Sequence, residues 1–185
     1  MNASVTWLAD ERRESASARI LDAAGRLFVE RGISAVGMTD VAEAAGCSRA
    51  TLYRYFADRT SLHIAYIHRE TLRIAARIGT DAFAVDDPVE RVLLAVELAL
   101  KEVRGSPPLL AWFRSVDVGP TSELATSSPV IVTVGAALLG DPEDPDVRER
   151  AAWMVRVVVS LLATPAGSPA EERRLLQRFV VPYVV

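Results

Sequence analysis

Apolar residues recur at helical spacing through most of the chain. From Ser15 onwards the first stripe follows positions i, i+1, i+4, i+7 and i+8, and it consists of Ile20, Leu21, Ala24, Leu27 and Phe28. This spacing places the stripe on one face of an amphipathic helix. Gly32 then stands where a glycine commonly ends a helix. The pattern predicts a first helix from about Ser15 to the residue before Gly32.

Three further helices are predicted after Gly32. The first runs from about Met38 to Ala45 and is stopped by Gly46, and the second runs from about Arg49 to Tyr55. The third begins near Arg59 and carries apolar residues at helical spacing towards Ile78. A three-residue break between two helices of about eight residues is typical of a helix-turn-helix.

Segments rich in proline and glycine divide the rest of the chain. The breaks are "GTDAFAVDDP", "GSPP", "VGPTSELATSSP", "GDPEDP" and "TPAGSP". They separate the predicted helical segments "LLAWFRSV", "VIVTVGAALL", "DVRERAAWMVRVVVSLLA" and "AEERRLLQRFVV". The valine-rich runs suit strands by propensity alone, but the long segment has charged residues in its first turn and no partner strands are present. The sequence therefore predicts an all-α fold.

The same breaks predict the domain organisation. Residues 1–14 are expected to form a mobile arm, and residues 15–74 a small domain with a helix-turn-helix at about 37–56. Residues 75–185 are expected to form a larger helical domain. A chain of 185 residues, half of them hydrophobic, can fill cores of this size.

Composition narrows the classes of function. The net charge of -3 gives no global basic excess, so binding to nucleic acid would have to depend on a local surface. Cys47 is the only cysteine, and the apolar run around Arg156 is too short to cross a bilayer. No signal peptide is expected at the N-terminus, so we expect a cytoplasmic protein without a membrane partner. His63 and His68 are not at metal-binding spacing, and we expect no metal or cofactor.

The predicted helix-turn-helix presents a polar face rich in arginine and tyrosine. Gly46 can end the first helix, and Ser48 is placed to cap the second. With the apolar residues turned inward, Arg49, Tyr53 and Arg54 lie outside, on the surface that such a motif inserts into the major groove of DNA. Arginine can bind guanine with two hydrogen bonds, whereas tyrosine hydroxyls suit phosphates. The predicted DNA-binding residues are Thr39, Ser48, Arg49, Ala50, Thr51, Tyr53, Arg54, Tyr55 and Arg59.

The segment "RILDAAGRLFVERGISAVGMTDVAEAAGCSRATLYRYFADRTSL" strongly resembles the DNA-binding domain of TetR-family transcriptional regulators. That family has the pattern Phe-x-x-x-Gly, then Ile/Val-Ala-x-x-Ala-Gly-Val-Ser-x-x-x-Leu-Tyr-x-His/Tyr-Phe, and finally a Lys and a Leu. The matching positions here are Phe28, Gly32, Val41, Ala42, Ala45, Gly46, Cys47, Ser48, Leu52, Tyr53, Tyr55, Phe56, Arg59 and Leu62. The match is specific and covers about the first third of the chain.

The resemblance implies a homodimer that binds a near-palindromic double-stranded DNA operator, most often as a repressor. It also implies that the larger domain dimerises and holds a small-molecule effector that changes the spacing of the two reading helices. Three positions depart from the family pattern. Gly37 replaces the usual Thr or Ser cap, Arg59 the usual Lys, and Cys47 the usual Val.

Two sets of residues in the larger domain are candidates for these roles. The segment from Val147 to Ala163 is apolar on nearly its whole circumference, which favours a dimer interface shared with the last helix. The predicted interface residues are Val155, Val158, Val159, Leu162, Leu175, Leu176 and Phe179. The aromatic residues of this domain either fill the core or line a pocket. The expected ligand of such a pocket is a small hydrophobic effector with at most one anionic or hydrogen-bonding group. The predicted ligand-binding residues are Trp112, Phe113, Trp153, Met154 and Arg156.

Two other classes of function remain as alternatives. An enzyme is disfavoured because the sequence offers no nucleophile–base pair, metal cluster or paired carboxylates. A helical protein that carries a hydrophobic ligand without binding DNA is the second class. Within the regulator class, a constitutive DNA-binding dimer without an effector is a further possibility. The leading hypothesis is a ligand-responsive, DNA-binding repressor that is not an enzyme.

Overall fold

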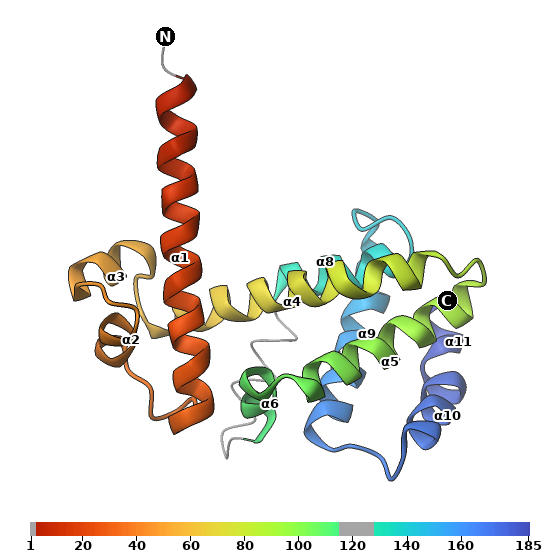
Figure 1. Ribbon diagram of the computed structural model, residues 1–185. Coiled ribbons are helices and arrows are strands. Elements are labelled where there is room, and N and C mark those ends of the chain that lie inside the picture. The colour runs from red at the N-terminus through yellow and green to blue at the C-terminus, as the bar shows by residue number, and fades with distance from the viewer. Residues whose placement is uncertain (1–2, 115–127) are drawn as a thin grey trace. The chain divides into compact units, whose positions relative to one another are not determined.

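The computed structural model describes residues 3–114 and 128–185, and every regular element in these ranges is an α-helix (Figure 1). The chain divides into two compact units, Met1–Tyr66 and Ile67–Val185. The valine-rich segments, which could have been strands by propensity, are helical because their neighbours supply helix caps and apolar packing partners on adjacent helices. The predicted all-α fold is confirmed.

The first unit contains α1 (Ala3–Arg31), α2 (Met38–Ala44), α3 (Arg49–Tyr55) and the start of α4 (Arg59–Phe83). The stripe predicted from the sequence forms its core: Ile20, Leu21, Ala24, Leu27 and Phe28 are all at most 5 % exposed. The Phe28 ring meets the rings of His63 and Tyr66 edge-on, with centroids 5.4 Å and 5.3 Å away. Such pairs of rings add to the stabilisation that comes from burial alone.

Two boundaries differ from the sequence prediction. Helix α1 begins at Ala3, so the segment predicted as an arm of residues 1–14 is helical from that residue. Residues 3–14 contain no glycine or proline that would stop the helix. Helix α4 is continuous to Phe83, and the two units meet at Tyr66 and Ile67, within that helix, instead of near residue 74.

The second unit contains the rest of α4 with α5 (Pro88–Gly105), α6 (Pro107–Arg114), α8 (Pro129–Leu139), α9 (Pro145–Ala163), α10 (Pro169–Phe179) and α11 (Val181–Val184). Four of these helices start in the same way, with a capping side chain followed by proline. Asp87, Ser128, Asp144 and Ser168 each accept a hydrogen bond from a backbone N–H in the first turn. The proline has no N–H to leave unsatisfied there, and its fixed φ suits a first helical position.

Close packing and a buried ion pair hold the second unit together. Helices α8 and α9 approach closely where Ala136 and Ala151, both fully buried, contribute only methyl groups. Arg104 on α5 donates two hydrogen bonds to the carboxylate of Glu172 on α10, at 2.8 Å and 2.6 Å, and a third to the backbone oxygen of Leu161 at 3.0 Å. These hydrogen bonds from Arg104 lower the pKa of Glu172. The burial of the Glu172 side chain acts in the opposite direction but has the smaller effect.

Candidate nucleic-acid interface and ligand cavity

The turn between α2 and α3 depends on one glycine and one serine. Gly46 has a φ of 66°, in the left-handed region that glycine adopts without steric cost. The backbone N–H of Cys47 then donates to the carbonyl of Ala42 at 2.9 Å, which ends α2. Ser48 begins α3, because its Oγ accepts a hydrogen bond from the Thr51 backbone N–H at 3.1 Å. The Ser48 and Thr51 hydroxyl groups also lie 2.9 Å apart.

Helix α3 has a buried face and an exposed face. Leu52 is fully buried, and Phe56, directly after the helix, is 6 % exposed. On the opposite face the side chains of Arg49, Ala50 and Arg54 are exposed, and Tyr53 is 43 % exposed. Leu52 and Phe56 thus fix the helix to the core of its unit, while the four exposed positions on the other side remain accessible to a partner.

The arginine and tyrosine side chains of this face interact with one another. The guanidinium of Arg54 lies over the ring of Tyr55, 5.6 Å from its centroid. A cation over an aromatic face is attracted by the ring quadrupole and loses part of its freedom of motion. Tyr55 itself is half-buried, with its ring 6.5 Å from that of Phe56. Arg54 is therefore held close to α3 with its charge facing solvent.

The start of α2 is organised without a capping side chain at Gly37. Instead, the Gly37 backbone N–H donates to the Asp40 carboxylate at 2.8 Å, and Arg31 pairs with the same carboxylate at 3.1 Å. Thr39, on the first turn of α2, is exposed. The contact that the family's Thr or Ser would supply at position 37 is absent, and Thr39 is the exposed hydroxyl in this turn.

Arg59 lies at the first position of α4 and is half-buried. Its Nη2 donates to the carbonyl oxygen of Ile33 at 2.6 Å, within the segment between α1 and α2. Burial, with a smaller contribution from the positive charge of Arg59, lowers the pKa of His63 to about 4. The predicted phosphate-binding arginine therefore also has a partner within its own unit.

A family model described as "Bacterial regulatory proteins, tetR family" matches residues 20–66. The uncharacterized HTH-type transcriptional regulator Rv1255c of Mycobacterium tuberculosis is 45 % identical over 185 residues, which cover 98 % of this chain and 92 % of that protein. The chain belongs to the TetR family of transcriptional regulators. The predicted family and the predicted helix-turn-helix regulator function are confirmed.

Two further relatives connect this TetR-family regulator to proteins with named roles. The HTH-type transcriptional repressor KstR of Mycolicibacterium smegmatis is 33 % identical over 106 residues, which cover 57 % of this chain and 52 % of KstR. The crystal structure of the TetR family repressor AlkX from Dietzia sp. strain DQ12-45-1b, implicated in biodegradation of n-alkanes, superimposes with a TM-score of 0.69. It has 26 % sequence identity and covers 91 % of this chain and 94 % of that one.

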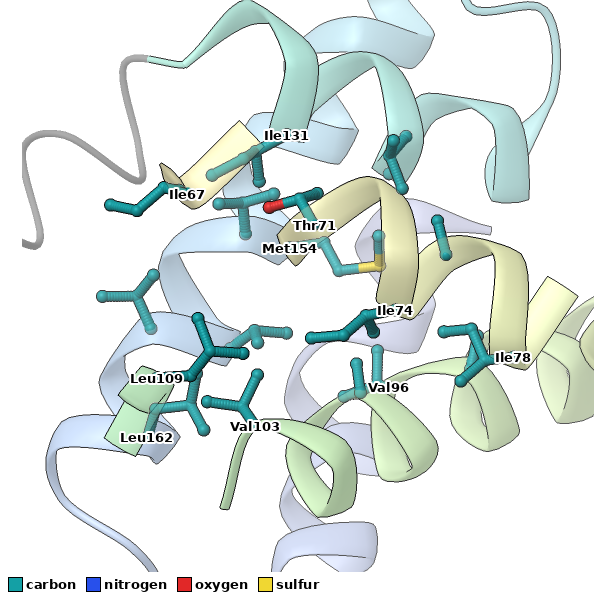
Figure 2. Close-up of a pocket in the computed structure, with 18 of the residues that line it drawn as sticks. Ile67, Thr71, Ile74, Ile78, Val96, Val103, Leu109, Ile131, Met154 and Leu162 are labelled. Carbon is teal, nitrogen blue, oxygen red and sulfur yellow. The ribbon is translucent and has the colours of Figure 1, made fainter. Parts of the chain in front are cut away.

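The second unit contains a partly open cavity of about 180 Å³. Helices α4, α5, α6, α8 and α9 all contribute side chains to its wall, as Figure 2 shows for Ile74, Val96, Leu109, Ile131 and Leu162. The wall consists of aliphatic and aromatic side chains, apart from the hydroxyl of Thr71. An apolar concave site of this kind suits a small molecule.

Three of the five predicted ligand-binding residues lie at this cavity, namely Trp112, Phe113 and Met154. Trp153 and Arg156 do not line it. The Trp153 side chain is 49 % exposed and lies with Phe179 and Tyr183 in a shallow surface depression, and Arg156 is exposed on the same helix. Their positions follow from the helical period. Trp153 comes one residue before Met154 and Arg156 one residue after Val155, and each such step along a helix turns the side chain away from the face that lines the cavity.

The residues predicted for the dimer interface separate into two groups. Val155, Val158, Val159 and Leu162 line the cavity of their own unit, and Leu176 is buried in its core. Leu175 and Phe179 are 38 % and 54 % exposed on α10. The apolar circumference of α9 is thus explained largely by packing within the chain, because α5, α6 and α8 cover most of it.

The contribution of α4 to the cavity was not predicted from the sequence. Ile67, Thr71, Ile74 and Ile78 line it from one face of that helix. Their spacing of i, i+4, i+7 and i+11 is a visible signal, but it also fits an ordinary core stripe. Near this face, His68 Nε2 lies 2.8 Å from the hydroxyl of Ser128, the buried cap of α8, and burial lowers the pKa of His68.

Within residues 3–114 and 128–185, no three side chains of His, Cys, Asp or Glu gather in a way that could hold a metal ion. No helix in the same ranges has the length and apolar character needed to span a bilayer.

Proposed function

We propose that this TetR-family regulator is a ligand-responsive repressor that binds a palindromic double-stranded DNA operator as a homodimer. The observation that carries this proposal is the exposed face of α3, with Arg49, Ala50, Tyr53 and Arg54 on a helix anchored by buried Leu52. Repression is supported by the relatives KstR and AlkX, which are named repressors, whereas the relative FasR is named an activator.

In the proposed mode of binding, α3 enters the major groove. Arg49 and Arg54 read base edges, and the methyl group of Ala50 contacts a thymine methyl. Tyr53, Tyr55 and Thr39 hydrogen-bond to phosphates and fix the register of the helix, with Ser48, Thr51 and Arg59 at its flanks. Because α3 is short, one helix reads only a few base pairs, and two copies are needed for a specific operator.

The proposed partner at the dimer interface is a second copy of the chain. Exposed apolar side chains gather on α9, α10 and α11, namely Trp153, Leu175, Phe179 and Tyr183. Large exposed aromatic residues in one region are typical of protein interfaces. A two-fold axis through this surface would pair the same residues from both subunits. Val155, Val158, Val159, Leu162 and Leu176 are assigned to the cavity and core in this proposal.

The proposed effector is a small hydrophobic molecule in the cavity of the second unit. Support comes from the apolar wall and from the structural similarity to AlkX, a repressor implicated in n-alkane biodegradation. We assign DNA binding to the unit Met1–Tyr66 and effector binding and dimerisation to the unit Ile67–Val185. The proposed role is regulatory and not enzymatic, and the site of action is the cytoplasm, where the operator is.

A mobility-shift assay with DNA that flanks the protein's own coding region tests this proposal. A discrete shifted complex that resists excess random DNA is expected, and footprinting of that complex should protect two half-sites about one helical turn apart or a multiple of it. Failure to retain any fragment in preference to random DNA would contradict the proposal. The cavity would then favour the second candidate, a helical carrier of a hydrophobic ligand.

A further inference from the structure

The cavity wall restricts the charge of any molecule that it can take up. None of the described residues that line it is charged, and their polar groups are the hydroxyl of Thr71 and the indole N–H of Trp112. An ionised group that enters such a site loses its hydration and gains no countercharge, which makes its burial very unfavourable. The wall therefore selects for uncharged molecules.

The charged residues next to the cavity on α4 are already paired. Glu70, which is 9 % exposed, accepts from Arg69 and Arg73 at 2.8 Å and 2.9 Å. Farther along the same helix, Arg77 pairs with Glu102 on α5 at 3.3 Å. Arg69 and Arg73 share the one carboxylate of Glu70, whereas recruiting Arg77 would leave Glu102 without its partner. Among these described residues of α4, a bound carboxylate could gain a cation only by breaking an existing ion pair.

The size of the cavity sets an approximate range for the ligand. Its volume is about 180 Å³. An engineered cavity of roughly 150 Å³ lined by aliphatic and aromatic side chains takes up benzene. By that scale the cavity accommodates roughly six to ten non-hydrogen atoms. The wall is mainly isoleucine, valine and leucine, so an aliphatic chain meets good packing partners along its length.

Thr71 gives the cavity one directional contact. Figure 2 shows its hydroxyl oxygen among the carbon atoms of the wall, near Met154 and Ile131. The Thr71 hydroxyl makes no side-chain hydrogen bond with any part of the chain that the structure describes. A threonine hydroxyl can both donate and accept, so it can bind an alcohol or a ketone equally well. Thr71 also lies on α4, which continues from the first unit into the second.

We infer that the cavity binds an uncharged, mainly aliphatic molecule of medium length with one hydroxyl or carbonyl group hydrogen-bonded to Thr71, and that it rejects the corresponding carboxylate. This inference rests on the proposed function only in that it names the class of the effector. Arg156 is exposed and does not line the cavity, so it is not an anchor for this ligand.

Isothermal titration of the full chain at pH 8 with 1-octanol, 2-octanone, toluene and octanoate tests the inference. Binding of the first three and no detectable binding of octanoate is expected. The isosteric variant Thr71→Val should bind 1-octanol roughly three- to tenfold more weakly, because one net hydrogen bond is lost. Its affinity for toluene, which has no polar group, should not change. Octanoate binding as tightly as 1-octanol, or an unchanged 1-octanol affinity in Thr71→Val, would overturn the inference.

A cavity-filling variant shows whether the ligands occupy this site. Ala99 lines the cavity from α5, and Ala99→Phe should abolish binding of 1-octanol and toluene together. Circular dichroism and the unfolding midpoint check that each variant is folded, and Ala99→Leu replaces Ala99→Phe if the phenylalanine is not accommodated. Unchanged binding in a folded, filled variant would place the ligand elsewhere and overturn the assignment. If 1-octanol binds as expected but leaves operator affinity unchanged, the site assignment stands and the proposed effector role fails.

Discussion

The guanidinium of Arg59 donates a hydrogen bond to the backbone carbonyl of Ile33, with a distance of 2.6 Å between Nη2 and O. This bond joins the first turn of α4 to the segment that follows α1. Gly32, with a φ of 78°, has just ended α1, and Ile33 is buried. The Ile33 carbonyl accepts a long hydrogen bond from the backbone N–H of Val36, at 3.3 Å, and Arg59 supplies a second, shorter and charge-assisted one.

Arg59→Ala is expected to destabilise the first unit. A buried carbonyl left without its charged donor costs about 1–3 kcal/mol in the free energy of unfolding. Urea unfolding measures this loss, and Arg59→Lys is the matched control for the charge without the fork geometry. An unchanged unfolding midpoint in Arg59→Ala would show that water replaces the bond.

If Arg59 also contacts a phosphate, the salt slope of operator binding should fall by about one unit in Arg59→Ala.

Arg54→Ala is expected to weaken operator binding and to relax the preference at one or two base pairs. Loss of a bidentate base contact costs about 1–3 kcal/mol, whereas the fold should persist because the side chain is exposed. Fluorescence anisotropy with the operator and its single-base variants measures both effects. Arg26→Ala, on the exposed face of α1, is the control for a general loss of positive charge. Equal loss of affinity for operator and random DNA would make Arg54 a phosphate contact.

The exposed aromatic surface gives a test of the dimer. Phe179→Asp should produce a folded monomer, because Phe179 is 54 % exposed in the single chain and its burial would come only from a partner. Val158→Asp should instead destabilise the chain itself, because it places a charge at the apolar cavity. Sedimentation velocity and thermal unfolding distinguish the two effects. A stable dimer of unchanged affinity in Phe179→Asp would place the interface elsewhere.

His63 is expected to make the first unit sensitive to acid. Burial lowers its pKa from 6.5 to about 4 in the folded chain, so the folded state keeps it neutral while the unfolded state takes up a proton. Stability should therefore fall as the pH decreases from about 6.5 to 4. Unfolding midpoints of the wild type and His63→Gln, measured across this pH range, give the contribution of His63. Carboxylates such as Glu172 are present in both proteins, so their contribution cancels in the comparison. Parallel pH profiles would show that the pKa of His63 is the same in the folded and unfolded states, which would contradict the prediction.

Local structure in the first unit could be predicted from the sequence because it depends on local rules. The stripe from Ile20 to Phe28 has the helical period, Gly46 tolerates a positive φ, and Ser48 caps the helix that follows it. Each signal lies within a few residues of the structure that it determines. The exposed face of α3 followed directly from these features once Leu52 was turned inward.

The second unit could be predicted less completely because its site is formed by five helices. An apolar residue on α9 packs equally well against a cavity, a core or a second subunit, and the sequence does not tell which helix covers it. Val158 and Leu162 were therefore predicted at an interface; they line the cavity of the single chain, and their place in a dimer interface stays a prediction. The hydrogen bond from Arg59 to Ile33 was missed for a similar reason, because a carbonyl acceptor is not visible in the type of residue that carries it.

The central claim is that the exposed face of α3 gives this TetR-family regulator sequence-specific binding to DNA. The most direct test is the ratio of its affinities for the selected operator and for a scrambled duplex of the same composition, at one salt concentration. The account predicts a preference of at least about 10³-fold, and a collapse of that preference when Arg49 and Arg54 are both replaced by alanine. Equal affinity of the wild-type protein for the two duplexes would contradict it.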